Sequence, residues 1–128
     1  MKTAVAAFVL LGALILSSVF LSSAQRNVLY PISEAICNFP SDVNELKTNA
    51  DTVIKVLVKS KKELEKNGFT ICLGVPQEEY ERLHSIMEKT IIYLREKEYP
   101  HALAYLEECK IYLDTLIDYC SVSANNIL

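Results

Sequence analysis

The sequence has no tryptophan, only three glycines and only two histidines among its 128 residues. It contains no Gly-rich loop that could cradle a phosphate, and neither Gly-x-Ser-x-Gly nor His-Glu-x-x-His occurs. The usual signatures of phosphate-binding, serine-hydrolase and zinc-protease sites are therefore missing. We expect a protein that is not an enzyme and that needs no cofactor or metal.

The long apolar run lies at the N-terminus, where residues 4–21 are interrupted only by one glycine and two serines. Lys2 precedes this run, and small residues occupy positions 22–24. The pattern is typical of a secretory signal peptide, with cleavage predicted between Ala24 and Gln25. An uncleaved membrane anchor is the alternative, because about 18 apolar residues nearly span a bilayer. We expect cleavage of residues 1–24, which leaves residues 25–128 as a single soluble, secreted domain.

Charge argues against a nucleic-acid partner. The whole chain has 13 basic and 16 acidic residues. Loss of Lys2 with the leader leaves 12 basic residues against the same 16 acids, a net charge of −4. Nucleic-acid binding needs a concentrated basic surface, which this balance does not favour. No Asn-x-Ser/Thr sequon is present, so N-glycosylation is not expected.

Helical periodicity predicts three long helices. Asp42 is an expected N-cap with Glu45 three residues later, and Asn67-Gly68 supplies a stop, so the first helix spans about residues 42–66. Pro76 opens the second helix. Its expected buried stripe is Tyr80, Leu83, Met87, Ile91 and Leu94. Pro100 begins the third, which we expect to end near Ser121 with a frayed tail behind it.

The predicted fold is therefore all-α. A short helix over residues 31–37, with Pro31 near its first position, precedes the three long ones. Short connections make the long helices antiparallel neighbours in a small bundle. Two disulfides are expected to staple this bundle, since four cysteines in a secreted chain form pairs.

The spacing of the cysteines restricts their pairing. Cys109 and Cys120 share one face of the third helix, but about 16 Å of helical rise separates them, too far for a bond. Each must therefore bond Cys37 or Cys72. We favour Cys37–Cys109 with Cys72–Cys120, because helix directions place Cys72 and Cys120 at one end of the bundle. Cys37–Cys120 with Cys72–Cys109 is the alternative.

Two groups of side chains are candidate partner-binding surfaces. Three lysines share one face of the first helix, and they would suit an anionic partner or a heparin-like surface: Lys55, Lys59 and Lys62. Three tyrosines form a stripe beside the cysteines on the third helix: Tyr105, Tyr112 and Tyr119. The ordinary interpretations are a solvated helix face for the lysines and the edge of the core for the tyrosines.

The two histidines give a weak signal. His84 and Glu88 are one helical turn apart, a spacing at which they could share a metal or a proton. Two ligands do not make a metal site, and His84 is expected to be a partly exposed residue on a helix flank. His101 follows Pro100 in a first helical turn, and the same interpretation applies to it.

The layout of leader, helices and four cysteines resembles the small all-helical salivary proteins of anopheline mosquitoes, the anophensin and albicin group. The resemblance covers most of the mature chain as architecture and assigns no residue a role. It implies an extracellular inhibitor of a host protein in the contact (kallikrein–kinin) or alternative complement system, and we expect the protein to be a monomer. The alternatives are an effector with another target and a carrier of a small apolar ligand, held near Phe69, Tyr80, Tyr105 and Tyr112.

Overall fold

The computed structural model describes the backbone of residues 1–127 and the side chains of residues 1–120. Every element in this part of the chain is an α-helix, which confirms the predicted all-α class. The six helices are α1 (Lys2–Cys37), α2 (Val43–Thr48), α3 (Ala50–Lys66), α4 (Gly68–Cys72), α5 (Gln77–Arg95) and α6 (Tyr99–Ile127).

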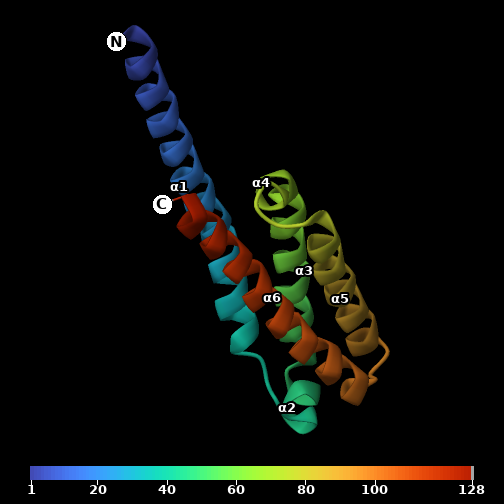
Figure 1. Ribbon diagram of the computed structural model, residues 1–128. Helices are drawn as coiled ribbons and strands as arrows, with labels where there is room; N and C mark the ends of the chain where they lie inside the picture. Colours follow the sequence, from blue (N-terminus) through green and yellow to red (C-terminus); the bar gives the residue numbers. More distant parts are fainter. Residues whose placement is uncertain (128) are drawn as a thin grey trace.

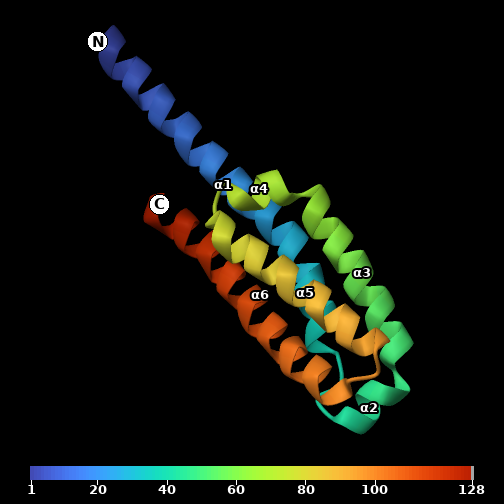
Figure 2. The same ribbon diagram turned by 90° about the vertical axis from the view of Figure 1, so that its right-hand side faces the viewer.

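The four longer helices lie side by side with alternating direction (Figures 1 and 2). Helix α1 runs down one side of the bundle, α3 returns upward, α5 runs down and α6 runs up again, while α2 and α4 turn the chain at opposite ends. Helix α6 packs most extensively, against α5 and α1. The long apolar face that the sequence gives α6 therefore forms the centre of the core.

Burial along α6 follows the predicted helical face. Its fully buried side chains are Ala102, Leu106, Cys109, Leu113, Leu116 and Cys120. The stripe predicted on α5 is likewise buried, with Tyr80 half-buried at its start. A buried Leu contributes about 1.5–3 kcal/mol to the free energy of unfolding, so these faces supply much of the stability.

The helix predicted over residues 42–66 is interrupted, and the prediction of one continuous helix is wrong. Asp42 caps its start as expected, accepting a hydrogen bond from the backbone amide of Asn44 (3.4 Å). At Asn49 the chain breaks into α2 and α3. The Asn49 side chain donates to the carbonyl of Glu45 (2.9 Å), alongside its own backbone amide (3.0 Å). Asn side chains compete for backbone partners in this way, which favours helix ends over helix interiors.

Helix α1 is much longer than the short helix predicted over residues 31–37. Pro31 lies inside α1 rather than at its start. Pro31 is exposed, so the carbonyl that loses its helical donor there can be hydrated. Helix α6 also exceeds its prediction, since it continues past Ser121 to Ile127; of the expected tail, Leu128 lies outside the described residues.

The first half of α1 projects beyond the rest of the fold (Figure 1). Most of its apolar side chains are exposed, among them Phe8 and Phe20, at 75% and 77%. By length and composition α1 is apolar enough to cross a membrane, a test that a signal sequence near the N-terminus also meets. Packing begins at Ser22, whose hydroxyl donates to the carbonyl of Cys120 (3.0 Å). The unpacked segment therefore ends within three residues of the predicted cleavage point.

The predicted disulfide staples are absent from this structure, in which all four cysteines are free thiols. Cys37 is exposed and its sulfur lies 3.9 Å from the hydroxyl of Ser33, whereas Cys109 is buried in the core. One sulfur therefore lies at the surface and the other in the core. Cys72 directly follows Ile71, whose carbonyl contacts Gln25, and Cys120 contacts Ser22. Cys72 and Cys120 thus lie at the same end of the bundle, near the same turn of α1.

Candidate functional site

The predicted lysine face of α3 is exposed to solvent. Lys55, Lys59 and Lys62 recur at steps of four and three residues, and Lys66 continues the series. Across the groove, the last turn of α5 adds Arg95. We call these five side chains the basic face. Within the described part of the chain, none of the five has an ion-pair partner.

Two members of the basic face were missed by sequence reasoning. Lys66 was detectable, because extending the series from Lys62 by four residues reaches it. Arg95 was not, since its place beside α3 depends on how α3 and α5 pack.

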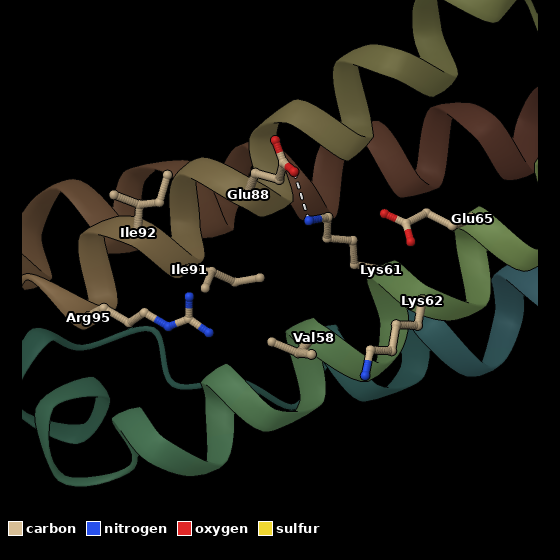
Figure 3. Close-up of a pocket in the computed structure, with 8 residues that line it drawn as sticks. All are labelled: Val58, Lys61, Lys62, Glu65, Glu88, Ile91, Ile92 and Arg95. Atoms are coloured by element: carbon tan, nitrogen blue, oxygen red, sulfur yellow. Dashed lines mark ion pairs between the residues drawn. The ribbon is translucent and has the colours of Figure 1, made fainter.

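The basic face borders two hollows between α3 and α5. The first has a volume of about 410 Å³, and Figure 3 shows Val58 of α3 and Ile91 of α5 pointing toward one another in it, with Arg95 extending into the same space. The second, of about 430 Å³, shares Val58, Lys62 and Arg95 with the first. It adds Ile54, Lys55 and Lys59. The hollows therefore have an apolar base, bordered by positively charged side chains. We call this base, formed by Ile54, Val58 and Ile91, the apolar floor.

One ion pair and one histidine–carboxylate hydrogen bond join α3 to α5 beside this floor. Lys61 Nζ lies 2.7 Å from Glu88 Oε1 (Figure 3), and His84 Nε2 lies 2.7 Å from Glu65 Oε1. The hydrogen bond and charge of Lys61 hold the pKa of Glu88 below its usual value. The carboxylates nearest the hollow thus already have partners on the facing helix, and the charge of the basic face is not cancelled by them.

The possible pairing of His84 with Glu88 is not what the structure shows. Glu88 pairs with Lys61, which reaches across from α3, and His84 contacts Glu65 instead. Among the described side chains, no group of three or more His, Cys, Asp or Glu residues is placed to hold a metal ion. His101 stacks on Tyr93, with ring centroids 5.4 Å apart.

The three candidate tyrosines of α6 do not form one exposed surface. Tyr105 and Tyr112 are half-buried and pack against the core from its edge. Tyr105 stacks on Tyr93 of α5, and the hydroxyl of Tyr112 accepts a hydrogen bond from Arg82 (3.1 Å). Tyr119 is 40% exposed. The first two are therefore engaged with α5, which leaves the basic face as the more accessible candidate.

The aromatic residues proposed for a carrier site have other roles. Phe69 is 82% exposed. The hydroxyl of Tyr80 donates to the carbonyl of Leu64 (2.9 Å), and its ring fills the space beside Gly68. Burial of Tyr80 raises the pKa of its hydroxyl, with smaller contributions from Cys72 and Glu65. Phe69 and Tyr80 therefore do not enclose a ligand together.

Comparisons with protein-family models, with curated proteins and with solved structures find no match for this chain.

Proposed function

We propose that the chain is exported, loses residues 1–24 and acts outside the cell as a non-enzymatic protein that binds and inhibits a protein partner through its surface. The observation that carries the proposal is the basic face. Four lysines and an arginine stand without ion-pair partners in the described part of a chain whose net charge is −3. Four of them, Lys55, Lys59, Lys62 and Arg95, line the apolar hollows between two packed helices, which form a preorganised surface for recognition.

Export is supported by how α1 is used. No residue before Ser22 belongs to the buried core of the part of the chain whose side chains are described. A segment that is costly to expose in water and unused in packing is explained by an earlier role in translocation. The uncleaved anchor remains the alternative for the same segment.

The resemblance to mosquito salivary proteins supplies the candidate targets. We propose a component of the contact (kallikrein–kinin) system or of the alternative complement pathway. A monomer with a rigid helical frame is sufficient for such inhibition. The proposal needs neither a cofactor nor a metal.

Oxidation of the cysteines is part of the same proposal, since export exposes thiols to disulfide formation. Cys72 and Cys120 lie at one end of the bundle and remain the better pair. Counted from the contact between Ser22 and Cys120, Cys37 lies about 22 Å along α1 and Cys109 about 16 Å along α6. Cys37 is therefore nearer in height to Cys109 than to Cys120, which favours Cys37–Cys109. Each bridge would stabilise the mature fold by about 3–5 kcal/mol in the chain-entropy model.

The test is capture of partners from vertebrate plasma by the oxidised mature protein, followed by clotting and complement-lysis assays. We expect capture of one contact-system or alternative-pathway protein and dose-dependent inhibition of the matching assay only. The reduced and alkylated protein is the control for a folded binding surface. Absence of both capture and inhibition would remove the blood-protein target.

A carrier of small apolar ligands is the second candidate, favoured by the two hollows between α3 and α5. It predicts that a fatty acid or biogenic amine raises the unfolding temperature of the mature protein. The inhibitor proposal predicts no such shift.

A further inference from the structure

We propose, building on the inhibitory function above, that the basic face binds an acidic segment of the partner that inserts an apolar side chain between α3 and α5. Carboxylates of that segment contact the lysines and Arg95, and its apolar side chain rests on Val58 and Ile54, the half-buried apolar residues that line the hollow. The proposal assigns the docking surface and the chemistry of what occupies it.

The length of the surface suits an extended peptide. From Lys55 to Lys66 the α-helical rise is about 16 Å, which an extended strand covers in about five residues. Arg95 faces this row from α5 across the apolar floor (Figure 3). In a peptide with an acidic residue on each side of an apolar residue, the carboxylates can therefore contact cations of both α3 and α5. Arg95 adds a planar guanidinium, which can hold a carboxylate by two hydrogen bonds.

The apolar floor favours a peptide as the ligand over a simple polyanion. Val58 and Ile54 are half-buried and Ile92 is 51% exposed, so apolar area remains open to a ligand at the hollow. Burying that area contributes about 25 cal/mol per Å², a gain that only a partner with an apolar group obtains. A sulfated polysaccharide offers charge without such a group.

The acidic residues beside the apolar floor also favour a peptide over a simple polyanion. Glu65 and Glu88 line the first hollow together with Lys61, Lys62 and Arg95. A uniformly charged chain laid along the groove would pass close to both carboxylates, of which Glu65 has only a histidine as its partner, and would be repelled there. A peptide can place its acidic side chains at the cations and its apolar side chain over the floor, and so avoid them.

The experiment measures binding of a fluorescent peptide with two glutamates on each side of a leucine to the oxidised mature protein. A peptide with serine in place of that leucine tests the floor, and a heparin fragment tests a plain polyanion. The protein variant Lys59→Glu with Lys62→Glu reverses two charges of the basic face. Lys47→Glu with Lys89→Glu makes the same change in net charge on α2 and on the α6-facing flank of α5.

We expect the basic-face variant to weaken binding of the leucine peptide by about tenfold or more, the ratio that 1.4 kcal/mol represents. The control variant should stay within about twofold, because distant surface charges are screened at physiological salt. The serine peptide should bind more weakly than the leucine peptide to both the wild-type protein and the control variant, because the apolar floor is the same in both.

Three results would overturn the inference: equal losses in both variants, tighter binding of heparin than of the leucine peptide, or no binding by any probe. The plasma assays separate this inference from the proposed function. If the basic-face variant still inhibits in plasma as the wild type does, the function stands and the docking surface is wrong. If the peptide binds as expected but plasma assays show no inhibition, the surface stands and the target is wrong.

Discussion

The side-chain amide of Gln25 occupies the space that a side chain on Gly74 would fill. A Cβ atom built on Gly74 would lie 2.5 Å from Gln25 Nε2. The same nitrogen donates to the carbonyl of Thr70 (2.9 Å) and, more weakly, to that of Ile71 (3.4 Å) at the end of α4. Gln25 is only 1% exposed. The residue predicted to become the mature N-terminus thus satisfies the end of a helix 45 residues later.

We predict that Gly74→Ala and Gln25→Ala are not additive. Gln25→Ala leaves the Thr70 carbonyl without its buried donor and should lower the free energy of unfolding by about 1–3 kcal/mol. Gly74→Ala alone displaces the Gln25 amide and should lower the free energy of unfolding by a similar amount. Gly74 does not have a positive φ, so the new methyl group adds no backbone strain.

A double-mutant cycle by urea unfolding measures this coupling. In the Gln25→Ala background, Gly74→Ala should be neutral or stabilising by about 0.4–1 kcal/mol, because the obstructing amide is gone. Simple addition of the two losses would show that Gly74 acts independently of Gln25.

We predict that a chain beginning at Gln25 folds as the full chain does. Among the side-chain hydrogen bonds of the described residues it loses the one from Ser22 to Cys120, which is worth about 0.5–1.5 kcal/mol. A chain beginning at Leu29 should unfold at a distinctly lower temperature, since it also lacks the Gln25 contacts. Circular dichroism during heating compares the two. Equal stability of the two truncations would mean that Gln25 has no structural role.

Secretion should yield Gln25 as the first residue in N-terminal sequencing of the protein recovered from the medium. Retention of residues 1–24 in a membrane fraction would support the anchor alternative instead.

Features that depend on residues close together in the sequence could be predicted. The apolar face of α6, the Asp42 cap and the start of α5 after Pro76 follow from local periodicity and capping. The break at Asn49 was missed because hydrophobic spacing continued through it, while a side-chain bond to Glu45 ended the helix. The length of α1 was missed because a proline was taken for a helix start, although an exposed proline is tolerated within this helix.

Only the α3 side of the candidate site could be predicted from the sequence. The lysine row lies on a single helix, and its spacing alone places it on one face. Arg95, Ile91 and the pairing of Lys61 with Glu88 come from a second helix, and no local pattern sets how α3 and α5 face each other.

We predict that the pKa of Glu88 depends on Lys61. The folded-state pKa lies below 4.5, so this carboxylate contributes stability above pH 4.5, and that contribution is lost as the pH falls through the lowered pKa. Because Glu88 is 49% exposed, the contribution is small, about 0–1 kcal/mol. The direct measurement is carboxyl NMR titration: Lys61→Met should raise the pKa of Glu88. Lys62→Met, one residue away and without an ion pair, should leave it unchanged.

We predict that the reduced protein reacts with alkylating agents in a set order. Cys37 is exposed and should be modified in the folded state. Burial raises the pKa of Cys109 to about 12, so its reactive thiolate is scarce at neutral pH and its sulfur is shielded. Cys109 should therefore react only on unfolding. Mass spectrometry of peptides after timed alkylation checks this, and fast modification of Cys109 would contradict its burial.

For the secreted protein we predict Cys72–Cys120 as the first disulfide to form. Both residues lie beside the turn of α1 that holds Ser22 and Gln25, whereas Cys37 must turn from solvent toward the buried Cys109 before it can bond. The substitution Cys37→Ser should therefore leave a protein with one bridge and a reduced Cys109, and Cys72→Ser should leave mixed or slowly oxidised products. Non-reducing peptide mapping distinguishes these outcomes. Recovery of Cys37–Cys120 or Cys72–Cys109 peptides from the wild type would reverse the pairing, and four alkylatable thiols would show that the bundle needs no staple.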